Sequence, residues 1–475
     1  MMLRLPSGLK QTFIYGISIA LMKGVSLLML PFIAHHLSTE EFGRLEVIST
    51  LAIIGSILVG MGLEDTLFRF AGAARDPQQQ RRLAAEIFTL TLIIGSIAIT
   101  GGWLMAELIA SWIPGKPTVY EVQLVLSMLA LEGCIAIPLG WLRMRNRAIS
   151  FFLATTGRAT TQALIVVVQL SFDRGVAGIL EAALIAAVIQ VIVLGYLHIR
   201  DTGIGLTRNT GVQSFIYSLP IVGSGLVAFA LNGLDRWVLA EHTSLTDVAQ
   251  FGVAAKFALA VVLLMQPFTM WWSPRRFAVL NEKNGREKVV RFISLGVVLI
   301  LIVSVLTSII SPLLITWLLP DSYAMAGQYV LGLVLIMLLR EMVELFKLGC
   351  FTGKTTSAQL IINTIASAVG IAAMLLWAPV YAVWGVIFAL ILAQALRLLL
   401  FFIAGQYFLP LPFDLRSLSL ISGITIFWIG VGTQISITWQ TLLIMLIAVI
   451  SLIATALLCK LVSIPALTST KVLSS

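Results

Sequence analysis

The chain has 475 residues, of which 59% are hydrophobic and 11% are charged, and its formal net charge is +9. A soluble domain carries about a quarter charged residues, so this composition excludes an ordinary soluble enzyme and indicates a protein that lies in a lipid bilayer. The three cysteines fall in or beside apolar runs, and they predict neither a disulfide framework nor a zinc site.

Apolar runs of about 20 residues, each long enough to cross a bilayer, recur along the chain. The first six predicted helices are 12–34, 42–62, 83–110, 119–142, 149–172 and 175–197. The next six are 213–234, 248–272, 292–318, 325–348, 357–377 and 380–404, and a last pair is 418–434 and 439–461. The sequence therefore predicts an all-α polytopic membrane protein with about fourteen transmembrane helices.

Lysines and arginines are distributed unevenly between the predicted loops. If the N-terminus lies in the cytoplasm, most loop cations fall on the cytoplasmic side, and the other side holds only Arg44, Lys116, Arg174 and Arg236. This positive-inside pattern predicts that both termini are cytoplasmic. The net positive charge is thus a topology signal, and we expect no nucleic-acid partner.

A short internal repeat follows the first and seventh predicted helices. The segments "HHLSTEEFG" (35–43) and "EHTSLTDVAQFG" (241–252) both join a histidine, a turn with hydroxyl and acidic residues, and Phe-Gly. We expect Ser38 and Thr246 to cap the following helices, with Glu41 completing a capping box. Because six helices separate the copies, the pattern predicts two parallel lobes, residues 1–200 and 201–410, followed by a two-helix hairpin with a cytoplasmic tail, residues 411–475.

The loops offer no catalytic constellation and no Cys/His spacing typical of a metal site, so we expect no enzyme activity, no cofactor and no metal. The segment "GCFTGKTT" (349–356) resembles a phosphate-binding loop. It has one residue too few between its first glycine and its Gly-Lys pair, and it follows a predicted membrane helix rather than a strand. It is interpreted as a cytoplasmic turn.

Charged residues inside predicted membrane helices are the informative ones, because they usually face a partner or a watery cavity. Lys23 lies near the middle of the first helix, on a face with Gly16, Ala20 and Ser26, and small residues of this kind mark close packing or a lumen. Its alternative role is to pair with a structural acid. The other embedded cations considered for binding an anion are Lys256, Arg340 and Arg158, and the acids considered for ion coupling are Asp65, Glu132 and Glu181.

Several local motifs carry a family resemblance. These are "LSTEEFGRLEV" (37–47), "SLPIVGSGLVAFALNGLDRWVLAEH" (218–242) with its Asp235–Arg236 pair, which is interpreted as structural, and "GK" at 353–354. Together with the helix pattern, they resemble the bacterial O-antigen and capsule repeat-unit flippases, the polysaccharide-transporter branch of the multidrug, oligosaccharidyl-lipid and polysaccharide exporter superfamily. The resemblance implies two six-helix lobes around a central cavity, alternating access, and an undecaprenyl-pyrophosphate-linked oligosaccharide as substrate.

The leading hypothesis is thus a flippase of the bacterial cytoplasmic membrane in which Lys23 and Lys256 compensate the pyrophosphate charge. The expected partners are the lipid-linked oligosaccharide, membrane lipid, a coupling proton or sodium ion, and a polysaccharide polymerase with its chain-length regulator. Two alternatives remain: a multidrug or cation antiporter of the same superfamily, and a membrane polysaccharide polymerase or ligase.

Overall fold

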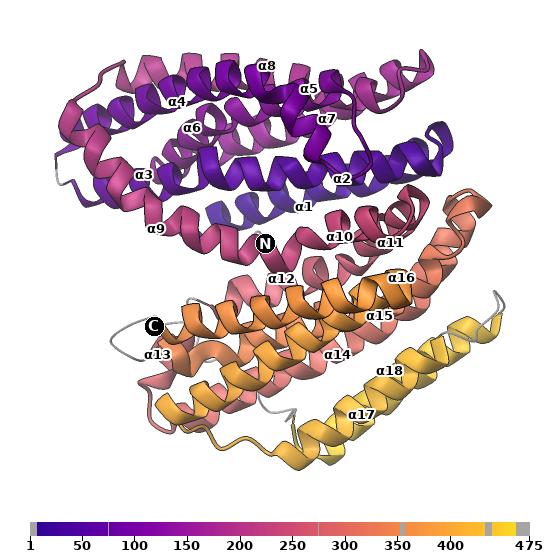
Figure 1. Ribbon diagram of the computed structural model, residues 1–475. Coiled ribbons are helices and arrows are strands. Elements are labelled where there is room, and N and C mark those ends of the chain that lie inside the picture. Colours follow the sequence, from indigo (N-terminus) through magenta and orange to yellow (C-terminus); the bar gives the residue numbers. More distant parts are fainter. Residues whose placement is uncertain (1–6, 75, 274, 352–356, 433–438, 462–475) are drawn as a thin grey trace, which may run out of the picture. The chain divides into compact units, whose positions relative to one another are not determined.

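A computed structural model describes residues 7–74, 76–273, 275–351, 357–432 and 439–461 (Figure 1). All regular structure within these ranges is helical. The internal contacts divide the chain into a first unit, Met1–Ala249, and a second unit, Gln250–Ser475. The division differs from the predicted lobe boundary at residue 200, which stays a prediction.

The helices of the first unit follow the predicted runs closely. They are α1 (Ser7–His36), α2 (Thr39–Ser56), the π-helix η1 (Ile57–Met61), α3 (Gly62–Ala73), α4 (Pro77–Trp112), α5 (Val119–Ala130), α6 (Glu132–Met144), α7 (Ala148–Ser171), α8 (Gly175–Thr202), α9 (Arg208–Asn232) and α10 (Leu234–His242). Helix α11 (Leu245–Ala258) crosses the boundary between the two units.

The second unit continues with α12 (Ala260–Trp272), α13 (Arg276–Leu280), α14 (Gly285–Leu318), the 3-10 turn η2 (Asp321–Tyr323), α15 (Ala326–Phe346), η3 (Lys347–Phe351), α16 (Ser357–Phe408), α17 (Leu415–Gly432) and α18 (Trp439–Leu458). Both α17 and α18 pack against α14, and they also pack against each other. Among the described residues, eight helical segments are long and apolar enough to cross a membrane, and shorter apolar helices accompany them. The protein is an all-α, multi-pass membrane protein, and the count of fourteen spans stays a prediction.

Several predicted helices are interrupted rather than straight. The second predicted helix contains the π-helical segment η1, the fourth breaks at Leu131, and the eighth breaks at Leu259. The second predicted helix was expected to end at residue 62, but the chain stays helical through α3 to Ala73. Glu64 and Asp65 therefore lie inside a helix, and Arg236 lies in α10 instead of a loop.

Small residues let the helices of the first unit approach closely. A side chain on Gly95 in α4 would overlap the carbonyl oxygen of Ala130, and one on Gly62 would overlap Ser218 in α9. Around these approaches lies a buried cluster of large side chains that includes Phe88 and Trp141. In lipid, such van der Waals packing replaces the hydrophobic effect as the main attraction between helices.

Two helix starts confirm and correct the predicted caps. Ser38 caps α2, and its hydroxyl accepts from the Glu41 backbone N–H while the Glu41 carboxylate accepts from the Ser38 N–H at 3.0 Å. The predicted cap at Thr246 is wrong, because α11 starts at Leu245 and Thr246 already lies inside the helix. Ser244 is the N-cap, and it forms a capping box with Asp247. Both copies of the repeat thus start a helix with a Ser-x-x-acid capping box.

Candidate functional site

Lys23 is half-buried inside α1, within a candidate membrane span. Helix α1 packs mainly against α7, and Ser18 on α1 is fully buried. Within the described parts of the chain, Lys23 makes no hydrogen bond and no ion pair with an acid. Whether Lys23 meets an anionic substrate or a structural acid stays a prediction.

The other three cations considered for anion binding lie in different surroundings. Lys256 in α11 and Arg340 in α15 are half-buried in their helices. Arg158 in α7 donates from Nη1 to the side-chain oxygen of Gln190 in α8 at 3.2 Å, and the Gln190 amide donates to the carbonyl of Ala154 at 3.1 Å. Arg158 thus links α7 to α8 through a buried glutamine.

Glu181 in α8 is the most heavily engaged of the three acids considered for ion coupling. It accepts hydrogen bonds from Tyr120 at 2.8 Å and from Gln169 at 3.0 Å, and it forms an ion pair with Arg174 at 2.5 Å. The hydrogen bond to Glu181 raises the pKa of Arg174, and the charge of the carboxylate adds to the effect. This arrangement satisfies the carboxylate as a structural group.

The remaining two acids differ in exposure. Asp65 in α3 is exposed, whereas Glu132 is half-buried at the break between α5 and α6. A side chain built on Gly60 would contact Cγ of Glu132 at 3.4 Å, so the stem of the Glu132 side chain lies beside the π-helical segment η1. Within the described residues Glu132 has no hydrogen-bonding or ionic partner. Irregular turns of this kind often occur at functional positions in helices.

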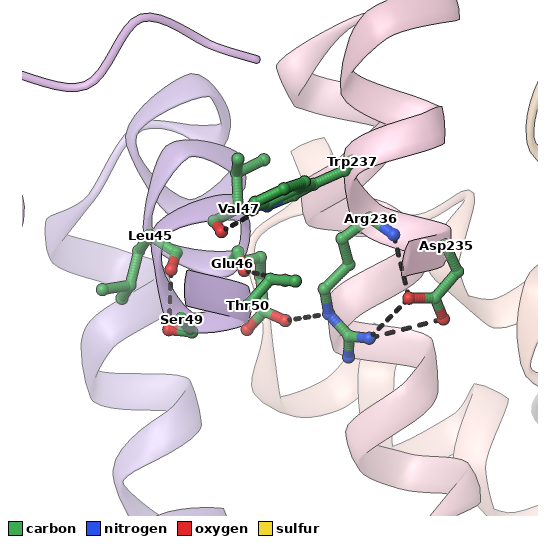
Figure 2. Close-up of polar contacts among 8 residues, drawn as sticks. All are labelled: Leu45, Glu46, Val47, Ser49, Thr50, Asp235, Arg236 and Trp237. Carbon is green, nitrogen blue, oxygen red and sulfur yellow. Dashed lines mark hydrogen bonds and ion pairs between the residues drawn. The ribbon is translucent and has the colours of Figure 1, made fainter. Parts of the chain in front are cut away.

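Asp235 and Arg236 form a buried ion cluster with Glu46, an acid that sequence reasoning did not select (Figure 2). Arg236 Nε lies 3.0 Å from Glu46 Oε2, and Arg236 Nη1 lies 3.2 Å from Asp235 Oδ1. The adjacent Trp237 donates from its indole to the carbonyl of Val47 at 3.2 Å. Since Glu46 and Asp235 are about 5–6% exposed, the cluster fastens α10 to α2 in a region of low dielectric constant.

The arginines predicted to face outward share one property. Each of the three is paired with a carboxylate within the first unit: Arg44 with Glu121 at 3.4 Å, Arg174 with Glu181, and Arg236 with Glu46. Their positive charge is thus locally compensated. Sequence reasoning found the arginines by topology and selected Glu181 for another role, whereas Glu121 and Glu46 lie on helices distant in the sequence from their arginines and were not selected.

A second buried carboxylate that sequence reasoning missed holds the segment before α9. Glu86 in α4 accepts from Arg82 at 3.0 Å, from Thr210 at 2.5 Å and from Thr207. The Gly205 N–H donates to the Thr89 hydroxyl at 3.3 Å. These contacts hold the connection between α8 and α9 against α4. The local signal in the sequence was Thr207, a hydroxyl residue at the position just before α9.

Cations and aromatic rings also gather near the end of α15 in the second unit. Lys347, the first residue of η3, pairs with Glu344 in the last turn of α15 at 2.5 Å. Arg276 lies over the ring of Phe351 at 5.1 Å. Burial lowers the pKa of Arg276, and the charge of Glu344 opposes this shift. The segment that resembled a phosphate-binding loop starts here in η3, and its residues 352–356, including Gly353 and Lys354, lie outside the described residues.

A cavity of about 340 Å³ lies among α14, α15, α16 and α17. Its lining is formed by Val297, Leu339, Met342, Phe346, Ala395, Leu398, Leu399, Phe402, Leu415, Leu418, Ser419 and Ser422. A lining of apolar side chains and two serines offers no compensating charge for an anion. The embedded cations of the helices, rather than this cavity, are therefore the candidates for contact with a phosphate.

Comparison with known proteins decides the family. A family model described as "Polysaccharide biosynthesis protein" matches residues 9–280, which is more than half of the chain. The chain belongs to the polysaccharide biosynthesis protein family. A relative from Haemophilus influenzae, "Lsg locus putative protein 1", is 23% identical over 291 residues, which cover 58% of this chain and 67% of that protein.

Solved structures show the same fold at low sequence identity. The lipid II flippase MurJ in an inward closed conformation is similar with a TM-score of 0.73 and 12% identity, covering 94% of this chain and 98% of that one. An inward-facing multidrug resistance MATE family transporter of the MOP superfamily is similar with a TM-score of 0.61 and 14% identity, over 84% of this chain and 96% of that one. At these identities the likenesses show a shared fold, and that fold agrees with the predicted all-α membrane architecture.

Proposed function

We propose that the protein is a flippase that moves undecaprenyl-pyrophosphate-linked oligosaccharide repeat units across the bacterial cytoplasmic membrane by alternating access. The family and the fold, whose relatives are flippases and transporters rather than enzymes, support this proposal. The single observation that carries it is Lys23, a half-buried lysine in a membrane span without an acidic partner in the described structure. Such a cation is costly unless an anion compensates it during the transport cycle.

In this proposal the pyrophosphate is the anion that Lys23 meets, and Lys256, Arg340 and Arg158 are further contacts for it. The prenyl chain stays in lipid while the charged head crosses between two lobes. Glu132 is the strongest of the three candidates for coupling a proton or sodium ion, because Glu181 already accepts three donors and Asp65 is exposed.

The test replaces Lys23 by alanine and by arginine and measures surface polysaccharide in a host that depends on this protein. Loss of one charge-assisted phosphate contact is expected to slow export about tenfold or more in Lys23→Ala, and Lys23→Arg is expected to retain most of it. Lys283→Ala, which removes an exposed loop lysine, serves as the matched control. Export by Lys23→Ala at the rate of the control would refute the phosphate role.

A multidrug antiporter is the second candidate, because the fold is also that of MATE transporters and because Glu132 offers a half-buried carboxylate. A carboxylate of this kind suits an organic cation or a coupling proton. Purified protein in vesicles would then extrude a cationic dye against a proton or sodium gradient. Under the flippase proposal we expect no dye transport above that of empty vesicles.

A further inference from the structure

We propose that Arg143, together with the hydroxyl of Tyr15, is an entry site for the substrate phosphate at the cytoplasmic end of the first unit, and that Glu64 occupies this site until the phosphate displaces it. The inference rests on the proposed flippase function and adds a site to it. Arg143 lies in the last turn of α6, which sequence reasoning assigned to a loop.

The guanidinium of Arg143 is held in a fixed place by aromatic rings from two other helices. Its central carbon lies 5.2 Å from the ring centroid of Phe68 in α3 and 5.8 Å from that of Phe151 in α7. Aromatic faces attract a cation without neutralising its charge, and they leave its N–H groups free to donate. The aromatic contacts thus position an arginine for a second, anionic partner.

Glu64 in α3 is that partner in the present structure, and it forms an ion pair with Arg143. The two side chains are partly accessible, with that of Arg143 40% exposed and that of Glu64 28% exposed, and the paired Glu64 Oε1 is itself covered. Ion pairs this exposed contribute little net stability, so a stronger anion can exchange with the carboxylate at small cost. A phosphate carries more charge than a carboxylate and binds arginine in a bidentate manner.

Tyr15 supplies the independent observation. Its ring packs edge-on against Phe151, with the ring centroids 5.1 Å apart, and its hydroxyl oxygen is buried without a hydrogen-bond partner among the described residues. A buried hydroxyl without a partner is unfavourable in a folded protein. Tyr15 and Arg143 both contact the ring of Phe151, and in the proposed site the Tyr15 hydroxyl donates to the anion that replaces Glu64.

The experiment measures binding to purified protein in phosphatidylcholine nanodiscs that contain undecaprenyl pyrophosphate. Arg143→Gln is expected to weaken binding about tenfold or more, and Tyr15→Phe to weaken it a fewfold. Glu64→Gln is expected to strengthen binding, because the competing carboxylate is gone. A merely structural ion pair would not gain affinity in that variant, so the opposite signs for Glu64→Gln and Arg143→Gln distinguish a binding site from a structural one.

Two controls make the outcome unambiguous. Nanodiscs with phosphatidylglycerol replace undecaprenyl pyrophosphate in a parallel series, since an ordinary anionic headgroup also carries a phosphate. If Arg143→Gln and Glu64→Gln affect only phosphatidylglycerol binding, or change neither, the entry site is refuted. Wild-type protein that fails to bind undecaprenyl pyrophosphate at all would instead refute the proposed function, whereas wild-type binding with unchanged variants refutes only the role of Arg143.

Discussion

The two copies of the internal repeat, at the starts of α2 and α11, have the same capping box but contact a later helix through different side chains, an arginine in α2 and a glutamine in α11. Both helices start at a Ser-x-x-acid capping box. At the same distance along the chain from its capping serine, each helix carries a side chain that reaches the start of another helix. In the first unit Arg44 pairs with the buried Glu121 in the first turn of α5. In the second unit Gln250 accepts from the Ala326 N–H at 2.8 Å and donates to the carbonyl of Ser322.

The difference shows which part of a repeat the fold requires. In each copy a long side chain joins the helix after the capping box to the start of a later helix, α2 to α5 in the first copy and α11 to α15 in the second. An ion pair makes this connection in the first copy, and a neutral amide makes it in the second. The first unit adds a further ion cluster, Arg236 with Glu46 and Asp235, to hold α10 on α2. At these positions the first copy is held by ion pairs and the second by neutral hydrogen bonds. Substitutions that remove these contacts should therefore affect the stability of the two copies differently.

The largest effect is expected from Arg236→Ala. It leaves two carboxylates that are about 5–6% exposed without the guanidinium they share. Removing one partner of a buried ion pair costs about 3–5 kcal/mol, so we expect a large drop in the melting temperature of the detergent-solubilised protein. Arg236→Lys keeps the charge but loses the forked geometry and should recover only part of the loss. A melting temperature of Arg236→Ala equal to that of the wild type would contradict the fastening role.

Intermediate effects are expected from Arg44→Gln and Gln250→Ala. Gln250→Ala leaves the buried N–H of Ala326 without its acceptor, which costs about 1–3 kcal/mol at any salt concentration. Arg44→Gln converts the charged contact of the first unit to the type found in the second. The difference in stability between Arg44→Gln and the wild type should shrink as the salt concentration rises. The Arg44 side chain is 29% exposed, so dissolved ions screen its attraction to Glu121. If the stability losses of Arg44→Gln and Gln250→Ala depended equally on salt, the two copies would not differ in using a charged and a neutral contact.

The smallest effects are expected from Ser38→Ala and Ser244→Ala. Each removes a helix N-cap worth about 1 kcal/mol, and because both caps have the same geometry the two losses should be similar. Thr246→Ala is the comparison variant, since Thr246 is not the cap and its hydroxyl contacts the Thr39 hydroxyl at 3.3 Å. Thr39→Ala removes the same contact, so a loss from Thr246→Ala larger than the losses from both Thr39→Ala and Ser244→Ala would restore the original assignment of that cap.

The helices were predictable because hydropathy alone determines where a chain of this composition crosses lipid. The fifth predicted helix, 149–172, differs from α7 by one residue at each end. The interruptions were not predictable, because the π-helical turn at Ile57–Met61 and the break at Leu131 depend on how the two helices pack against each other. The cap at Ser244 was predictable from its spacing to Asp247, but the nearby Thr246 was chosen instead.

The candidate site was only partly predictable. Lys23 stood out because a charge inside an apolar run is conspicuous in the sequence. In contrast, Glu46 and Arg236 are 190 positions apart and meet only in the folded chain. Arg143 looked like one of many loop cations until the structure placed it between Phe68 and Phe151.

The break inside α16 has a consequence for how the protein enters the membrane. The chain reverses at Ala382, whose φ is 50° and ψ is −128°, and Arg397 returns to donate to Asn363 at 2.8 Å. A side chain on Gly385 would overlap the carbonyl of Trp377, so the turn has no room for a polar loop. During biosynthesis, the two halves of α16 are expected to leave the ribosome, pair as a hairpin and partition into lipid together.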